Sequence, residues 1–417
     1  MNRKILISAL VTVALLPALA LTRTRGSSPS PQDDGNTLAL VGAKIYISPT
    51  DPPIANGTIL IRGGKIEKVD QAGAIQIPEG AAQIDCKSAV ITAGFQNSHV
   101  HFTQPKWDYA QGQSASELQQ KLEDMLTRYG FTTVVDTGSF LANTAALRKR
   151  IETGDVLGPR ILTSGTPLYP PDGIPYYLGD IPPEIRKLMP QPSTPAGAIS
   201  AVDANLSGGA DIIKLFTGSW VARGKVKPMP VDVATAAVEE AHKHGKLVFT
   251  HPSSVAGLQV ALDAHVDVLA HSIEDMRGWN DSYLTKMKAA HMTLIPTLKL
   301  FGADDDIQKI LDEVLGYQRI GGQILFGTDV GYLTDYNPAD EYELMFRAGL
   351  TPMQILASLT TAPAERFGEG DQRGRIAAGM RADLAVLEAD PAQEPTNFVK
   401  VRYTIRRGQV IYPPPAN

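Results

Sequence analysis

The chain has 417 residues, of which 43% are hydrophobic and 20% charged, and its formal net charge is −5. This is the composition of a globular protein with a large core, and without a cluster of Lys and Arg it lacks the basic surface that a nucleic-acid partner requires. The lone Cys86 excludes an internal disulfide. The length allows two or three domains, although an eight-fold α/β barrel can use about 250 residues as one.

The N-terminal segment is predicted to be an export signal. A basic start precedes an apolar stretch and Pro17, with the small-residue sequence ALA at 18–20. This order is typical of a cleaved signal peptide over residues 1–20, followed by a flexible leader over residues 21–36. We therefore expect an exported protein, periplasmic or extracellular, with no membrane contact beyond the signal peptide. An uncleaved anchor is the alternative, but Pro17 interrupts a segment that is short for a span.

Short β-type runs occupy both ends of the remaining chain. Residues 37–88 hold LALVGAKIYI, GTILIRGGKIEKVD and AAQID between Gly and Pro turns, and residues 369–417 hold ADLAVLEAD and VKVRYTIRRGQVIY. Neither end has enough strands for a stable sheet alone. We expect the two ends to pair into one small β-sandwich beside a central domain.

The central segment, residues 89–368, alternates apolar strand-like runs with helical stretches, which is typical of parallel βαβ units. One expected helix covers residues 116–129, with Gly130 as its stop. Eight repeats predict an α/β fold with a closed, TIM-like (β/α)8 barrel. The expected strands are residues 89–95, 132–136, 160–164, 211–216, 247–250, 268–270, 293–297 and 324–327.

Residue types that bind metals follow these strands. In such a barrel the loops after the strands meet at one mouth, where the chemistry takes place. Each residue alone has a structural explanation, such as a hydrogen-bonded core histidine or a helix-capping aspartate. Together they would form a costly buried polar cluster unless a metal ion compensates it. The candidates are His99 and His101 after the first strand, Lys214 within the fourth, His251 after the fifth, His271 after the sixth and Asp329 after the eighth.

A second histidine pair, His242 and His244, has a different interpretation. It ends the helical stretch before Gly245, and neighbours two apart on a helix diverge. We expect both side chains to be solvated near a helix C-terminus. His265 and His291 are likewise expected to be structural.

After the leader, the sequence resembles the amidohydrolase superfamily. The resemblance rests on GFQNSHVHF, the lysine of DIIKLFTG, THP at His251, AHS at His271, GTDVG at Asp329, TPMQILASLTTAPAERFG and the closing GRIAAGMRADLAVLEADP. The opening HVHF, the strand-four lysine and the closing phrase are most similar to the imidazolonepropionase-like branch, which includes Xaa-Pro dipeptidases. That branch often carries EHG where this chain has AHS, so the dipeptide preference is left open.

The resemblance implies a binuclear metal centre. Lys214 would bridge the two ions, which requires carboxylation of its amine by CO2, because an ammonium has no lone pair for a cation. Two zinc ions and a carbamate on Lys214 are the expected cofactors. The implied ligands are His99, His101 and Asp329 for the more buried ion, and His251 and His271 for the more exposed one.

The implied reaction is hydrolysis of a C–N bond in a small amide, carbamate, N-acyl amino acid or dipeptide by a metal-bound hydroxide. Asp329 is expected to take the hydroxide proton and deliver it to the departing nitrogen, while His271 could alternatively orient the substrate. A mononuclear deaminase or cyclic-amide hydrolase is the first alternative, and an exported, non-catalytic binding protein the second. The exact substrate, the native metal and assembly into a homo-oligomer are left open.

The loops after the strands should select the substrate. The longest follows strand three, and Tyr169, Tyr176 and Tyr177 in it could equally form an aromatic lid or a packed surface loop. Arg277 and Lys299 are candidates for binding a substrate carboxylate, with a solvated side chain as the alternative. The expected substrate-binding residues are Tyr169, Trp220, Arg277 and Tyr332.

Overall fold

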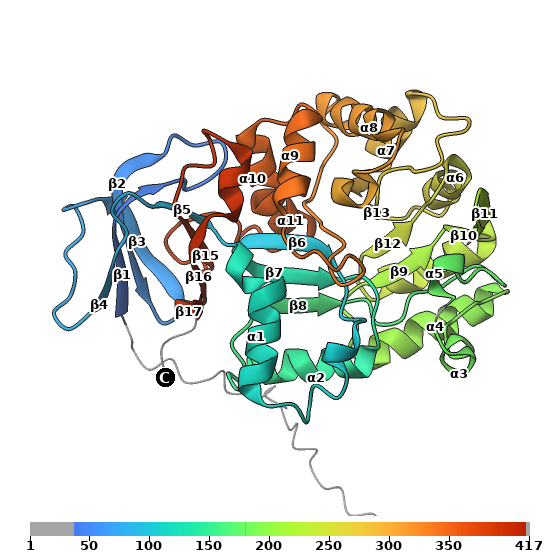
Figure 1. Ribbon diagram of the computed structural model, residues 1–417, viewed down its shortest axis with the longest axis horizontal. Helices are drawn as coiled ribbons and strands as arrows, with labels where there is room; N and C mark the ends of the chain where they lie inside the picture. The colour runs from blue at the N-terminus through green and yellow to red at the C-terminus, as the bar shows by residue number, and fades with distance from the viewer. Residues whose placement is uncertain (1–36, 180, 414–417) are drawn as a thin grey trace, which may run out of the picture. The chain divides into compact units, whose positions relative to one another are not determined.

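A computed structural model describes residues 37–179 and 181–413 (Figure 1). The predicted signal peptide and leader therefore lie outside the described residues. Within the two described ranges, no helix has both the length and the apolarity needed to cross a lipid bilayer.

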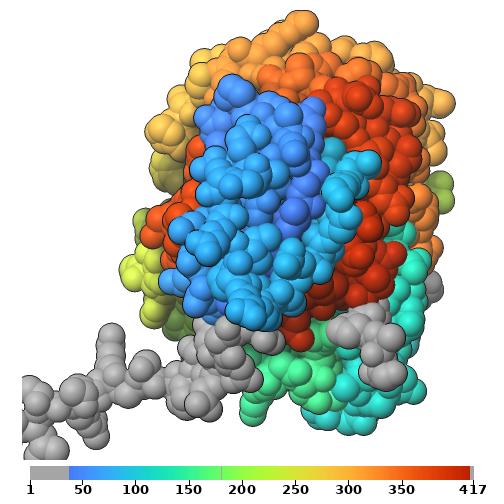
Figure 2. All heavy atoms as spheres, turned by 90° about the vertical axis from the view of Figure 1, so that its left-hand side faces the viewer, coloured from blue at the N-terminus to red at the C-terminus, as the bar shows by residue number. Residues whose placement is uncertain are grey.

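The two ends of the described chain share one eight-stranded sheet, as the sequence predicts. Its order is β17-β16-β15-β5-β1-β2-β3, with β4 paired to β1. β15 runs antiparallel to β5, with Leu384 opposite Ala93. Figure 2 shows the result: N-terminal residues in blue adjoin C-terminal residues in red. The strands are β1 (Thr37–Ile45), β2 (Ile54–Arg62), β3 (Lys65–Gln71), β4 (Ala82–Asp85), β5 (Val90–Ala93), β15 (Leu384–Leu387), β16 (Val401–Arg406) and β17 (Gln409–Tyr412).

One apolar core serves strands from both ends of this sheet. Ile66 of β3 and Ile405 of β16 belong to the same buried cluster, although they lie near opposite ends of the strand order. The turns after β2 and β16 also touch: a Cβ on Gly64 would lie 3.0 Å from the carbonyl oxygen of Arg407. Burial of these apolar side chains therefore stabilises the association of the N-terminal and C-terminal strands through the hydrophobic effect.

The central segment forms two parallel sheets. Parallel strands joined by helical crossovers bury both faces, which explains why these strands are apolar throughout. The first sheet contains β6 (Phe95–Val100), β7 (Phe131–Asp136) and β8 (Arg160–Thr163) in that order. The second has the order β14-β13-β12-β9 and contains β9 (Ile213–Phe216), β12 (Val248–His251), β13 (Val268–Ala270) and β14 (Thr293–Ile295).

Backbone hydrogen bonds run between these two sheets. The Asp211 amide before β9 donates to the Thr163 carbonyl of β8 at 2.7 Å. The predicted eighth strand, residues 324–327, is not a regular strand. It nevertheless lies between β14 and β6, since Leu325 donates to the Leu294 carbonyl and Ser98 donates to the Phe326 carbonyl.

The predicted first barrel strand, residues 89–95, is wrong in detail because it is divided between two sheets. β5 pairs with β1 and β15, whereas β6 begins at Phe95 and pairs with β7. Gly94 makes the change: its amide donates to the Asp383 carbonyl, and a Cβ there would lie 2.3 Å from Thr132 Oγ1. Hydrophobicity alone does not tell which sheet an apolar run joins.

Helices connect the parallel strands. The predicted helix over residues 116–129 is shorter: α1 (Ala115–Met125) begins at a capping box of Ser114 and Glu117 and is followed by a separate 3₁₀ turn (Thr127–Tyr129). Gly130, with φ +84°, is the stop as predicted. The others are α2 (Leu141–Glu152), α3 (Pro183–Arg186), α4 (Pro195–Ser207), α5 (Val231–Lys243), α6 (Val255–Asp263), α7 (Ser282–Ala289), α8 (Ile307–Arg319), α9 (Ala339–Arg347), α10 (Pro352–Leu359) and α11 (Thr361–Arg366).

Candidate active site

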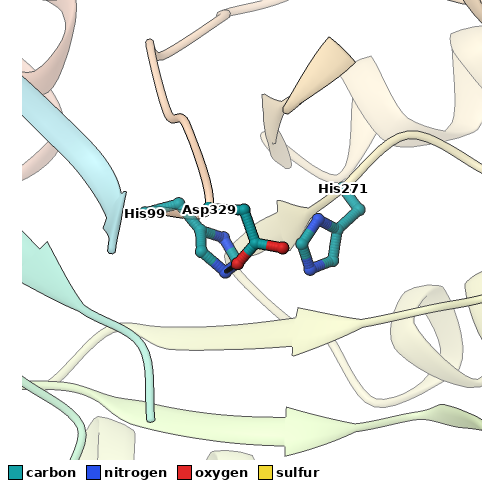
Figure 3. Close-up of side chains that lie close together, drawn as sticks. All are labelled: His99, His271 and Asp329. Carbon is teal, nitrogen blue, oxygen red and sulfur yellow. Dashed lines mark ion pairs between the residues drawn. The ribbon is translucent and has the colours of Figure 1, made fainter. Parts of the chain in front are cut away.

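The predicted ligands meet at the carboxyl ends of the parallel strands. His99 Nε2 lies 3.2 Å from His101 Nε2, and Asp329 Oδ1 lies 3.0 Å from the latter and 3.3 Å from the former. His271 is close too, since His99, His271 and Asp329 each offer a ligand atom within 4.8 Å of one another. Figure 3 shows these last three side chains pointing toward one another.

This spacing fits a divalent cation. Ligand atoms held about 2.1 Å from one ion, in tetrahedral or octahedral directions, are separated by about 3.0–3.4 Å. The atoms of His99, His101 and Asp329 have this separation. Imidazole nitrogen and carboxylate oxygen are also donor types that zinc accepts. The residues present therefore fit a metal centre.

The hydrogen bond of His101 Nδ1 determines which ring nitrogen of His101 is free to bind a cation. His101 Nδ1 lies 2.8 Å from the carbonyl oxygen of Gly138, which can only accept a hydrogen bond. Nδ1 must therefore carry a proton, and Nε2, which faces Asp329, holds the lone pair when the ring is neutral. Gly138 is in turn held by Asp136, whose Oδ1 accepts from the Gly138 amide.

His271 is oriented in the same way by Thr297. His271 Nδ1 lies 2.7 Å from Thr297 Oγ1, and this hydroxyl donates to the Pro296 carbonyl, also at 2.7 Å. A hydroxyl has one proton, so toward His271 it accepts. The Nδ1–H tautomer is thereby selected, and Nε2 is left as the ligand atom.

Several of these residues have a left-handed backbone. The φ angles are +100° at His271, +57° at Asp329 and +48° at Thr297. For residues other than glycine this conformation costs about 1–3 kcal/mol, and it persists only where the surroundings enforce it. These strained backbone conformations lower the stability of the fold, and they direct the His271 and Asp329 side chains toward each other.

Burial keeps most of the imidazoles neutral. It lowers the pKa of His99 to about 3, and it holds the pKa values of His251 and His271 well below the usual range. Burial opposes ionisation of Asp329, but its contacts with His101 and His99 hold its pKa well below normal. For His101, burial lowers the pKa but the contact with Asp329 outweighs it and the pKa is raised. Neutral imidazoles beside a carboxylate are a suitable donor set for a cation.

Lys214 lies buried within this cluster. Its side chain is 1% exposed, and burial lowers its pKa to about 7. Its charge also lowers the pKa of His99, His251 and His271, so it is close to all three. Among the described residues no carboxylate lies within ion-pair distance of its amine. A large share of this amine is therefore uncharged, and nucleophilic, at neutral pH.

His251 ends β12 and completes the group. Its ring stacks on Phe216 with centroids 4.8 Å apart and lies edge-on to His271 at 4.5 Å. Phe216 ends β9 and lies two residues after Lys214, so β9 supplies both the stacking ring and the buried lysine beside His251. Parallel pairing aligns His251 with Phe216 in register.

Comparison with known proteins decides the family. The model of the amidohydrolase family matches residues 90–411, which is most of the chain. This chain belongs to the amidohydrolase family. It is therefore a metal-dependent hydrolase, and the prediction from its motifs is confirmed.

Individual relatives agree with this assignment. Ochratoxinase from Aspergillus niger is 23% identical over 411 aligned positions, which cover 87% of this chain and 83% of that enzyme. Imidazolonepropionase from Thermoplasma acidophilum is 22% identical and covers 86% and 89%. A solved structure of a Xaa-Pro dipeptidase, with methionine bound in its active site, superposes with a TM-score of 0.77 at 22% identity and covers 90% and 99%. The amidohydrolase thus has a TIM-barrel-like α/β fold.

Aromatic side chains line the surroundings of the amidohydrolase site. Tyr169 is buried against Phe216, with ring centroids 4.6 Å apart. Tyr177 meets Tyr332, which follows Asp329, at 5.7 Å between centroids. Trp220, on the hairpin of β10 (Gly218–Ala222) and β11 (Lys225–Pro228), donates its indole N–H to Glu274 at 2.6 Å. Tyr176 packs edge-on against Tyr177 and is half-exposed.

The two cations predicted for a substrate carboxylate already have partners. Arg277 is mostly exposed and binds both oxygens of Asp275, at 2.8 and 2.5 Å. Lys299 Nζ lies 2.7 Å from an Asp335 carboxylate oxygen and 2.6 Å from the Asn337 carbonyl. Neither offers the free charge that the sequence suggested.

Sequence reasoning missed the residues that orient the ligands. Asp136 is fully buried at the end of β7 and also accepts from Thr163 at 2.7 Å and from Ser139. Its position at the end of a barrel strand was a readable signal. Thr297 gave no such signal, because its role depends on its contact with His271, 26 residues away.

The second histidine pair lies at the end of α5, as predicted. His242 is half-exposed and meets Asp267 at 2.7 Å, while His244 lies 3.4 Å from Glu240. Asp203, Glu240 and His244 form a second group with ligand-type spacing, but it is largely exposed. Exposed acidic groups of this kind are common without an ion.

Proposed function

We propose that this amidohydrolase cleaves a C–N bond of a small amide or dipeptide at a binuclear centre bridged by carboxylated Lys214. The observation that carries the proposal is the burial of Lys214 among His99, His251 and His271 without a carboxylate partner. An unpaired buried ammonium is costly, whereas a carbamate would be an anion between two cations. His99, His101 and Asp329 would hold one ion, and His251 and His271 the other.

The metal ions, zinc by the donor set, would acidify a water molecule and polarise the substrate carbonyl. Asp329 is the proton carrier: its carboxylate takes the proton of the attacking water and passes it to the departing nitrogen. Thr297 would fix the His271 ring so that Nε2 is free to bind the second ion. His101, whose tautomer is fixed by Gly138, would present Nε2 to the same ion as Asp329.

A mononuclear deaminase or cyclic-amide hydrolase is the second candidate. It is favoured by one observation: His99, His271 and Asp329 alone already form a group with the spacing of a single ion site. In that case Lys214 would stay an uncarboxylated amine. Metal stoichiometry separates the two proposals.

We also propose the finer architecture. Residues 89–368 would close into an eight-stranded barrel through residues 324–330, as the hydrogen bonds of Leu325 and Ser98 suggest. Residues 37–88 and 369–417 would fold as one β-sandwich, supported by the core that β3 and β16 share. The division of β5 from β6 moves the start of the barrel to Phe95.

Export remains a proposal that rests on the first 20 residues of the sequence, which read as a signal peptide followed by a leader to residue 36. It predicts that the mature protein starts near residue 21. Intact mass of the secreted protein tests this directly.

The substrate class is supported by the relatives. One is named for dipeptides of the Xaa-Pro type and another for ochratoxin, so small amides are the first compounds to test. The experiment is a panel of dipeptides and N-acyl amino acids with zinc-loaded protein, alongside chelator-treated protein. Turnover that is lost with the metal and restored by zinc supports the proposal. No turnover by fully metal-loaded protein on any amide would contradict it.

A further inference from the structure

Glu274 places a carboxylate in the loop that follows β13, at the carboxyl ends of the parallel strands. It follows His271 by three residues and is held from the β10 hairpin by the indole N–H of Trp220, at 2.6 Å. Burial raises the pKa of Tyr177 well above its usual range and also raises that of Tyr332, and the charges of Asp329 and Glu274 contribute to both shifts. The two tyrosines pack edge-to-face, and Tyr332 follows Asp329 by three residues.

This carboxylate has no cationic partner. No Lys, Arg or His among residues 37–179 and 181–413 lies within ion-pair distance of Glu274, whereas its neighbour Asp275 is bound by Arg277. Its side chain is open to solvent and its single hydrogen bond comes from a neutral indole. A lone carboxylate in this position is suited to a ligand that brings a positive charge.

One aromatic side chain contacts Glu274, and two others respond to its charge. Trp220 touches Glu274 directly, and Tyr177 and Tyr332 form an edge-to-face pair near it. Tryptophan and tyrosine rings attract ammonium groups through their negative faces. A carboxylate among such rings combines ion pairing with cation–π attraction.

The adjoining cavity is acidic. It has a volume of about 950 Å³ and is shared by the loop after β13 and by α8, and Glu274 is part of its lining. Its cations are Arg277, Lys309 and Arg319. They are outnumbered by five carboxylates, which are Glu274, Asp275, Asp281, Asp306 and Asp312, while the buried Glu313 carboxyl holds its proton. The surroundings therefore repel anions and favour cations.

Three cations of the neighbouring loops have partners. Arg277 binds Asp275, Lys299 binds Asp335, and Lys106, in the loop after β6, donates to the Tyr336 hydroxyl at 2.7 Å. Glu274, which has no ion-pair partner among the described residues, thus favours a substrate amine over a substrate carboxylate.

We infer that Glu274 binds a free ammonium group of the substrate, so that the enzyme acts on small amides that carry an amine, such as aminoacyl amides, and needs no substrate carboxylate. This inference rests on the proposed amide hydrolysis. It assigns Glu274 a specificity role, with Trp220 as the residue that positions its carboxylate.

The test compares matched substrates that differ in one charge. Alanyl-leucinamide has a free amine and no carboxylate, and its N-acetyl derivative lacks the charge. We expect kcat/KM to be about 10- to 100-fold higher for the free amine, the range of one charged hydrogen bond. In Glu274→Gln this ratio should fall toward one through KM, in Glu274→Asp it should partly recover, and in the exposed α5 variant Glu239→Gln it should stay unchanged.

Two results would overturn the inference in different ways. Equal or faster hydrolysis of the acetylated compound, or an unchanged ratio in Glu274→Gln, contradicts the role of Glu274 and leaves amide hydrolysis intact. Hydrolysis of neither compound, nor of any other amide, by zinc-loaded protein contradicts the proposed function itself. Trp220→Phe gives an independent check, because it removes the indole N–H and should lower the same ratio.

Discussion

The Thr297 hydroxyl accepts a hydrogen bond from His271 Nδ1 at 2.7 Å while donating its own proton to the Pro296 carbonyl. Thr297, which follows β14, thereby fixes the tautomer of His271, which follows the neighbouring strand β13. Such partners of metal ligands commonly contribute about 10- to 100-fold to metal affinity or activity.

Removing this hydroxyl should weaken the centre. In Thr297→Val we expect metal affinity or kcat to fall by about 10- to 100-fold, because the His271 ring loses its orienting acceptor. Thr297→Ser keeps the hydroxyl and is the control, with values near wild type. Titration with a metal-competing chelator and steady-state kinetics measure both effects. Equal behaviour of the valine and serine variants would exclude tautomer control.

Asp329 should be the most sensitive catalytic position. Asp329→Asn keeps the size of the side chain but cannot take a proton, so we expect kcat to fall by about 10³-fold or more. Metal content should be measured on the same sample, since Asp329 is also a proposed ligand. A variant that retains its metal and turns over near the wild-type rate would refute the proton-transfer role.

Gly331 should tolerate no side chain. Its φ is +101°, and a Cβ would lie 1.9 Å from the carbonyl oxygen of His101. Gly331→Ala should therefore displace the His101 or Asp329 segment and lower both melting temperature and activity. Gly73 is the matched control: its φ is +87°, but nothing lies within 4 Å of a Cβ, so Gly73→Ala should cost only the roughly 1–2 kcal/mol of a left-handed backbone. Similar losses in both variants would contradict the contact.

Glu313 should make stability depend on pH. This α8 carboxyl is fully buried beneath the loop after β13, and burial raises its pKa to about 8. The folded state therefore binds the proton more tightly than the unfolded state, whose carboxyl has an ordinary pKa. The free energy of unfolding should fall as the pH rises from about 4.5 to about 8, by as much as a few kcal/mol.

Glu313→Gln should remove this contribution. The amide oxygen can still accept the hydrogen bond from the Ile273 amide, which is 3.0 Å long in the wild type. Denaturant unfolding at several pH values, on metal-loaded protein, should give a flatter profile than wild type. The exposed Glu343→Gln on α9 is the control. An identical slope in wild type and Glu313→Gln would show that this carboxyl does not titrate on unfolding.

Much of the site could be predicted because barrel strands place their last residues at one mouth. His101, His271 and Asp329 follow apolar runs closely enough that the strand ends were visible in the sequence. Their convergence then follows from the topology rather than from any local signal. The pairing of the chain ends was predictable for a similar reason, since neither β-rich end could form a sheet alone.

Other features depend on tertiary contacts that a local pattern cannot contain. The break between β5 and β6 occurs at Gly94, where close approach to Thr132 decides which sheet each half joins. α1 ends at Met125 because Leu126, with φ −137° and ψ −61°, leaves the helical conformation and leads into the 3₁₀ turn before Gly130. The contact of Glu274 with Trp220 joins residues 54 positions apart, so no local pattern predicts it.

The central claim is a binuclear centre bridged by carboxylated Lys214, and metal content per chain tests it most directly. Plasma mass spectrometry on protein purified without chelator, with bicarbonate present, should find two metal ions per chain. In Lys214→Ala this number should fall, while the exposed β11 variant Lys225→Ala should match wild type. One ion or none per chain in the wild type, or an undiminished metal content in Lys214→Ala, would contradict the account.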